Sequence, residues 1–357
     1  MSKNKIYTVL ILLCSAFLLY WLTQRAKPGP ATTSLPQSKV AIPSLTPFWK
    51  TLPIRIGENQ GDWLQRQRGE DSLLFDFFVQ KILQSDPKTV YSLWQNPGVD
   101  SLTQDVTAFW DSNNPEVIQA RQDLTKLLGR YPSLLQTAGG FSPDSLPPLP
   151  VPVGMVGLFQ YQCVLSDSNL WIGLDLFMKE SYRYYPTVDQ LYLYQRRRTH
   201  PRHMPIAVAR TLSEDLVDQL NPGSSSGKLL NQMLREGRIM ACLRLLVPET
   251  PDSLLLGYDP DQWKWICQNE NEVWKNLVRS QALFSEDPLV TARYLSDGPF
   301  TSGLSPSSPP ALGRFLGDRI MQQWLANQKA TKGWIKAQGP PEQILQESGY
   351  RGRSSSL

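Results

Sequence analysis

The longest apolar run of the chain lies near its start and predicts a membrane anchor. Residues 6–22, "IYTVLILLCSAFLLYWL", carry no charge. As a helix with a rise of 1.5 Å per residue, this run is about 25 Å long, just enough to cross the hydrocarbon core of a bilayer. Lys3 and Lys5 precede it, and no small-residue cleavage site follows it. We therefore expect an uncleaved transmembrane helix over 6–22, with the bulk of the protein outside the cytoplasm.

The next segment changes character, because residues 24–48 are rich in proline, serine and threonine and show no apolar periodicity. This composition is typical of a linker. Apolar residues at helical spacing begin after Phe48 and Trp49, so a single globular domain is expected over 49–352. In its front third, Asp71 is expected to cap a helix, and Asn114 followed by Pro115 marks another helix start.

Most of the domain has the 3.6-residue period of amphipathic helices. Residues 153–178 differ: two β-rich runs are joined by the turn residues "SDSN", which predicts a hairpin. The predicted fold is therefore α+β and mostly helical, with helices packed around a small β-sheet and no regular alternation of strand and helix. Beyond the helix capped by Asp71, the predicted helices cover residues 100–110, 115–136, 205–220, 229–246, 260–278, 288–296 and 311–328.

Composition narrows the choice of function only slightly. The formal net charge of +4 is too even to indicate nucleic-acid binding, and we expect no nucleic-acid partner. Of the four cysteines, Cys14 falls in the predicted anchor, which leaves an odd number without CxxC spacing. Neither a disulfide framework nor a zinc knuckle is indicated, so buried thiols are expected at Cys163, Cys242 and Cys267, with one disulfide pair in an oxidising compartment as the alternative.

Both histidines of the chain lie in "RRRTHPRHMP", residues 196–205. His200 and His203 straddle Pro201, a spacing that suits the turn before a helix. A catalytic zinc requires three protein ligands, and no third histidine exists. Neighbouring arginines would also repel a cation, so we predict no metal and no cofactor. The arginines of this stretch could instead contact phospholipid headgroups or an acidic partner. The alternative is a solvated basic loop. The four arginines are Arg196, Arg197, Arg198 and Arg202.

Two carboxylates occupy apolar positions. Glu270 lies on the face of a predicted helix that also carries Ile266, Val273 and Trp274, and Asp175 lies in the apolar run "WIGLDLFM". An unpaired buried carboxylate costs several kcal/mol, so each should have a partner. We predict a buried polar network of structural rather than catalytic role. The candidate partners of Glu270 are Arg235, Arg238, Arg314 and Arg319.

Five stretches of the chain, in a fixed order, together resemble one known family. The similarity extends over roughly residues 70–353, and its order and spacing are more specific than any single motif. The stretches are "VLSDSNLWIGLDLFMKESYRYYP" (164–186), "LLNQMLREGRIMACLRLLVP" (229–248), "LLLGYDPDQWKWICQNENEVWKNLVRSQALFSEDP" (254–288), "ALGRFLGDRIMQQWL" (311–325) and "ILQESGYRGR" (344–353). They resemble the gliding-motility protein GldB family of Bacteroidetes. The sequence departs from the family at Leu316 and Asp318, where relatives carry tryptophans, and in having an apolar helix where they carry a lipidated cysteine.

The resemblance implies a zincin-like fold, and zincin chemistry needs an HExxH helix with two metal-binding imidazoles. The corresponding helix reads "PIAVARTLSEDL" and holds no histidine. Glu214 and Asp215 lie in it, but carboxylates alone do not make a zinc site. We therefore expect a non-enzymatic, membrane-anchored component of a gliding-motility or secretion-linked assembly. The alternative is a zincin-related hydrolase with an atypical metal site, and a third reading is a polysaccharide binder with exposed aromatics in a groove.

The resemblance also sets the expected location and partners. A protein of this kind would be placed in the cell envelope, anchored to the membrane by its N-terminal helix with its large domain in the periplasm. Its partners would be other envelope or motility-machinery proteins.

Overall fold

The computed structural model describes residues 43–352, except 190, 329–331 and 337–338. All of these residues belong to one compact unit. The predicted anchor over 6–22 and most of the linker over 24–48 lie outside the described residues. None of the helices within the described ranges is both long enough and apolar enough to cross a bilayer.

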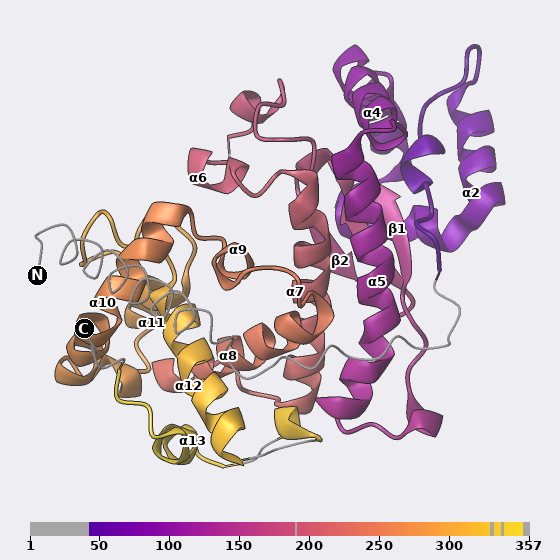
Figure 1. The fold of residues 1–357 in the computed structure, drawn as a ribbon. Helices are drawn as coiled ribbons and strands as arrows, with labels where there is room; N and C mark the ends of the chain where they lie inside the picture. The colour runs from indigo at the N-terminus through magenta and orange to yellow at the C-terminus, as the bar shows by residue number, and fades with distance from the viewer. Residues whose placement is uncertain (1–42, 190, 329–331, 337–338, 353–357) are drawn as a thin grey trace, which may run out of the picture. The chain divides into compact units, whose positions relative to one another are not determined.

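The unit is mostly helical and contains one small sheet, which confirms the α+β prediction (Figure 1). The front helices are α2 (Gln60–Phe77), α3 (Pro87–Trp94), α4 (Pro97–Trp110) and α5 (Pro115–Thr137). After the sheet come α6 (Leu193–Arg196), α7 (Met204–Leu220), α8 (Leu229–Leu246), α9 (Asp252–Leu256), α10 (Pro260–Arg279), α11 (Pro288–Leu295), α12 (Leu312–Gln328) and α13 (Pro341–Ser348).

The helix starts follow the predicted capping chemistry. Asn114 accepts a hydrogen bond from the Glu116 amide, with Pro115 in the first turn. Asp71 does cap a helix, but it does so inside α2, where its extended backbone kinks the helix and its carboxylate accepts from the Leu74 amide. An earlier helical segment, from Gln60, precedes this kink and was not predicted.

The sheet has three strands in the order β1–β3–β2. The predicted hairpin is confirmed: β2 (Cys163–Leu165) pairs antiparallel with β3 (Asn169–Gly173). The first β-rich run is divided, however, because β1 (Val151–Met155) ends early and pairs parallel with β3. Leu158 and Phe159, both with positive φ, turn the chain between β1 and β2. The sequence pattern gave no sign of the parallel pairing, since the two partners are separated by β2 along the chain.

Side chains alternate across β3, so the sheet separates two hydrophobic clusters. Trp171 packs with Phe48, Phe78 and their neighbours from the front helices. Leu170 and Ile172 face the larger cluster, which includes residues of α5, α7, α8 and α12. The small sheet is therefore covered by helical segments on both faces, as the sequence pattern predicted.

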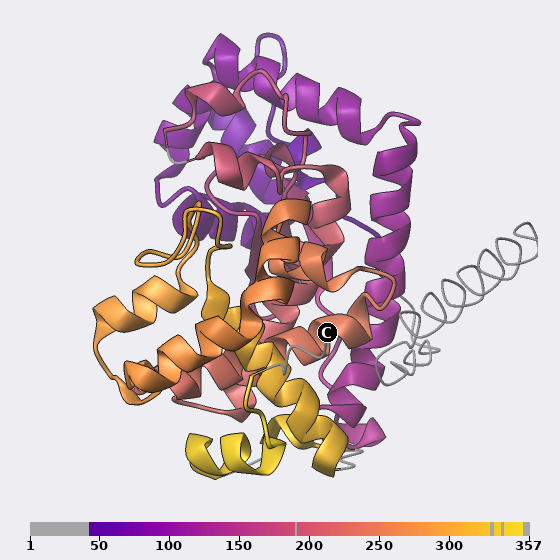
Figure 2. The same cartoon turned by 60° about the vertical axis from the view of Figure 1, so that its left-hand side comes forward.

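The closest helix crossing joins α8 and α12, with α13 packed beside α12 (Figures 1 and 2). A Cβ on Gly317 of α12 would overlap the Met233 carbonyl of α8, and a Cβ on Gly237 would overlap the Gly317 carbonyl. Gly313 likewise faces Leu295 and the Tyr294 carbonyl. The small glycines thus allow the backbones of α8 and α12 to approach each other closely.

Candidate functional site

The arginine run before α7 does not form one anion-binding patch. Arg198 makes two hydrogen bonds to Asp297, of 2.7 and 3.1 Å. Arg197 pairs with Asp259, and Arg196 Nε donates to the Leu191 carbonyl at 3.1 Å. Arg202 is exposed and lines a shallow hollow. Two of the four predicted contact arginines are therefore already paired with carboxylates of the same chain.

The two histidines lie in different environments. His200 Nε2 lies 3.1 Å from a carboxylate oxygen of Glu116, which also pairs with Lys179. His203 is buried, and its burial, with the nearby charge of Arg202, lowers the pKa of His203 to about 4. Across the described ranges, no three His, Cys, Asp or Glu side chains are grouped so as to hold a metal ion.

A charged cluster joins α7, α8 and α12 around Glu236, which is 7% exposed. Arg210 Nη2 lies 2.6 Å and Arg235 Nη1 3.1 Å from its carboxylate, and Arg314 Nε is 3.4 Å away. Burial raises the pKa of Glu236, but the arginines outweigh this effect and the net pKa is lowered. Arg235 also forks onto Asp218. Arg235 and Arg314 are thus partners of Glu236, and the prediction that either pairs with Glu270 is wrong.

Glu270 is buried as predicted, and its partners are Tyr350 and Arg319. The Tyr350 hydroxyl donates to one carboxylate oxygen at 2.9 Å, and Arg319 Nε lies 3.8 Å from the other. Of the four candidate arginines, Arg319 is the one the structure places beside Glu270. Sequence reasoning missed Tyr350, because a tyrosine 80 positions away gives no periodic signal.

Asp175 lies away from Glu270, and its carboxylate binds backbone amides. Its carboxylate accepts hydrogen bonds from the Phe159 amide at 2.6 Å and the Gly157 amide at 3.2 Å. Burial raises the pKa of Asp175 to about 6, against the effect of these amides. The carboxylate thus holds the left-handed turn between β1 and β2. The single network predicted to join strand and helices is corrected to several separate polar sites.

Arg238 differs from the other buried charged side chains because it has no partner among the described residues. It is 3% exposed, and within the described part of the chain its side chain makes no hydrogen bond and no ion pair. Burial lowers the pKa of Arg238 to about 10. Its neighbour Cys242, one helical turn on, is also buried, and burial raises the pKa of that thiol, so the thiol stays neutral. The expected pairing of Arg238 with Glu270 is wrong.

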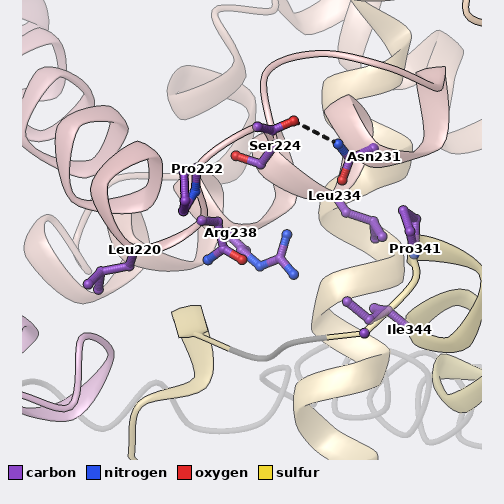
Figure 3. Close-up of a pocket in the computed structure, with 11 residues that line it drawn as sticks. Leu220, Pro222, Ser224, Asn231, Leu234, Arg238, Pro341 and Ile344 are labelled. Atoms are coloured by element: carbon purple, nitrogen blue, oxygen red, sulfur yellow. Dashed lines mark hydrogen bonds between the residues drawn. The ribbon is translucent and has the colours of Figure 1, made fainter.

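The Arg238 side chain enters a pocket of about 340 Å³ between the loop after α7, helix α8 and helix α13 (Figure 3). We call this the Arg238 pocket. Ser224, 5% exposed, also lines it, and its hydroxyl makes no hydrogen bond to the described residues. The apolar side is formed by Leu234, Pro341 and Ile344.

Two asparagines hold the loop that forms one wall of the pocket. Asn231 Nδ2 donates to the carbonyls of Gly223 and Ser226 at 3.1 and 3.0 Å, and Asn221 Nδ2 donates to the Ile335 carbonyl. The amide donors are therefore occupied, while the Arg238 guanidinium and the Ser224 hydroxyl are not. Among the described residues that line the pocket, none carries a carboxylate or imidazole that could act as a base. In the sequence, the sign that Arg238 is buried was its position one helical turn from both Leu234 and Cys242.

Comparison with known families now places the chain. A sequence model described as gliding motility protein GldB matches residues 48–352. The chain belongs to the GldB family. No curated protein and no solved structure matched significantly. The resemblance seen in the sequence is thus confirmed, and the match covers nearly all the described residues.

One departure from the GldB pattern has a clear structural consequence. Asp318, where relatives are expected to carry tryptophan, is buried and faces Arg244, whose two terminal nitrogens each lie 2.6 Å from its carboxylate oxygens. In this GldB-family chain the position therefore supplies a charge to an ion pair between α8 and α12. Sequence reasoning named Asp318 as a departure but did not find its partner.

Proposed function

We propose that this protein acts in the cell envelope as a non-enzymatic component of a gliding-motility or secretion-linked assembly. The observation that carries the proposal is the GldB-family match over the globular part of the chain. The apolar run over 6–22 would anchor it in the membrane, and the lysines before that run favour a periplasmic position for the large domain. Its partners would be other envelope proteins of the same machinery.

The charge arrangement on α7 supports binding rather than turnover. If the fold is zincin-like, as the family resemblance implies, α7 occupies the place of the metal-binding helix. Its Glu214 pairs with Arg210 at 2.7 Å, and Arg210 also pairs with Glu236. A carboxylate already neutralised by a guanidinium, with further arginines beside it, is a poor ligand for a divalent cation.

The surface that we assign to partner contact is α6 with the residue before it. Tyr192 and Leu193 are 59% and 67% exposed, and the Tyr192 ring stacks on Tyr194 with the ring centroids 5.8 Å apart. Arg197, also exposed, follows directly. An exposed tyrosine beside an exposed apolar side chain is typical of protein interfaces. Because Arg197 and Arg198 are paired internally, the aromatic and apolar residues would carry the contact.

Site-specific crosslinking in the native membrane tests this proposal. A photoreactive phenylalanine at Tyr192 or Leu193 should trap one or a few defined envelope proteins. The same residue placed at Leu289, which is 77% exposed on α11, serves as the matched control and should not trap them. Identical products from Leu289 and from α6, or no product from α6, would contradict the assigned surface.

A further inference from the structure

Arg238 carries a charge that no other described residue neutralises. Removing a guanidinium from water without an ion pair or hydrogen bonds costs several kcal/mol, and an apolar side chain at the same place would avoid that cost. The guanidinium instead lies at the centre of the Arg238 pocket, between the Ser224 loop and the α13 side chains of Pro341 and Ile344 (Figure 3). Arg238 Nε is buried without a hydrogen-bond partner among the described residues, and the guanidinium borders a pocket of about 340 Å³, an arrangement suited to receive an anion.

Other arginines of this chain show what kind of anion satisfies such a group. Arg244 forks onto Asp318, and Arg210 pairs with Glu236. Arg130 forks onto Glu249, with contacts of 2.7 and 3.1 Å. In each case the partner is a carboxylate, whose planar shape matches the guanidinium fork. The partner that Arg238 lacks is expected to have the same chemistry.

The rest of the pocket limits the size and character of the ligand. Ser224 offers a single hydroxyl beside the guanidinium, and the asparagine amides are occupied by carbonyls. One fork and one hydroxyl suit a monoanionic carboxylate better than a phosphate dianion, which needs more donors. Leu234, Pro341 and Ile344 give the remaining wall an apolar surface that fits a short aliphatic group.

We propose that the Arg238 pocket binds a carboxylate attached to a short aliphatic group. The carboxylate forks onto Arg238 and accepts a hydrogen bond from Ser224, and the aliphatic group packs against the α8 and α13 side chains. This chemistry is shared by small branched organic acids and by the free end of a peptide with an aliphatic last residue. The pocket's role does not depend on the partner contact at α6, so either can fail alone.

Titration calorimetry on the purified full-length chain tests the assignment with three organic probes and inorganic phosphate. 4-Methylpentanoate represents a free organic acid, N-acetyl-leucine represents a peptide end, and 4-methylpentanamide is the neutral control. We expect saturable binding of at least one carboxylate and none of the amide. Preference for N-acetyl-leucine would assign a peptide end, and preference for 4-methylpentanoate a free acid. Phosphate bound more tightly than both carboxylates would overturn the carboxylate assignment.

Variants locate the binding. Arg238→Met should weaken carboxylate binding by about tenfold or more, and Ser224→Ala by a smaller factor. Arg279→Met removes one exposed charge on α10 outside the pocket and should bind like the original protein. If Arg238→Met does not fold, Arg238→Lys keeps the charge without the planar fork and should still bind several-fold more weakly. Unchanged binding in the Arg238 variants, or no carboxylate binding by the folded original protein, would overturn the proposal.

Discussion

The Arg244 guanidinium and the Asp318 carboxylate form a bidentate pair between α8 and α12, with both hydrogen bonds 2.6 Å long. Both side chains are largely removed from water, and the pair lies on the same two helices that meet at Gly237 and Gly317. Burial alone would lower the pKa of Arg244, but Asp318 and Asp252 raise it overall. The Arg244 guanidinium therefore stays charged.

Breaking this pair should be costly. Arg244→Met leaves the Asp318 carboxylate buried without its cation, and such losses typically reduce the free energy of unfolding by about 3–5 kcal/mol. Urea unfolding followed by tryptophan fluorescence measures the change. Asp252→Asn is the matched control, because Asp252 contacts the same guanidinium but is 30% exposed, so its loss should be well below that of Arg244→Met. Equal losses in the two variants would contradict the buried-pair account.

The glycine contact between α8 and α12 makes a second prediction about stability. Gly317→Ala forces a Cβ into the Met233 carbonyl, so the helices must separate, and we expect a loss of about 2 kcal/mol or more. Gly69→Ala, in α2, is the control because no atom lies within 4 Å of its added Cβ. Alanine there should stabilise the helix by about 0.5–1 kcal/mol. Chemical unfolding of both variants measures these changes in the free energy of unfolding. A Gly317→Ala protein as stable as the original would contradict the close crossing of α8 and α12.

His203 should make the fold sensitive to mild acid. Its pKa is about 4 in the folded protein and 6.5 in a model peptide, so the unfolded chain binds the proton first as pH falls. Stability contributed by neutral His203 is complete above pH 6.5 and is lost as pH falls towards 4. Between pH 7.5 and 4.5, the original protein should lose about 2 kcal/mol more than His203→Phe, which has no proton to bind. Urea unfolding at the two pH values measures this, and an equal loss in both proteins would show that His203 is not buried.

Metal content separates the binding role from the hydrolase alternative. The purified full-length chain, dialysed without chelator and examined by inductively coupled plasma mass spectrometry, should retain zinc well below one ion per chain. His200→Ala together with His203→Ala should not change this value. Stoichiometric zinc that survives dialysis and disappears in the double variant would support an atypical metal site instead.

Helix starts, the hairpin and the burial of single side chains could be predicted from the sequence, because a few neighbouring residues determine each of them. Asn114 with Pro115 marked the start of α5, and the turn residues after Leu165 marked the β2–β3 hairpin. Glu270 was recognised as buried from its position on an apolar helix face. These signals depend on spacing of 3.6 or 2 residues, or on caps and turns, and all lie within one element.

Long-range pairing was not readable in this way. The parallel pairing of β1 with β3 and the choice of Tyr350 and Arg319 as partners of Glu270 depend on how distant segments meet. The candidate site shows the same limit. Arg238 was identified as a charge needing a partner, but only the packing of the loop after α7 against α8 and α13 shows that its partner is not a residue of the described chain.

The measurement that tests the account most directly is the stability of Arg238→Met without added ligand, compared with Arg244→Met under the same conditions. If Arg238 is an unpaired cation kept for binding, methionine should fill the same space without the desolvation cost, and the variant should be as stable as the original or about 1–3 kcal/mol more stable. Arg244→Met should be destabilised by several kcal/mol. A loss at Arg238→Met as large as that at Arg244→Met would mean that Arg238 supports the fold, and it would contradict the binding pocket.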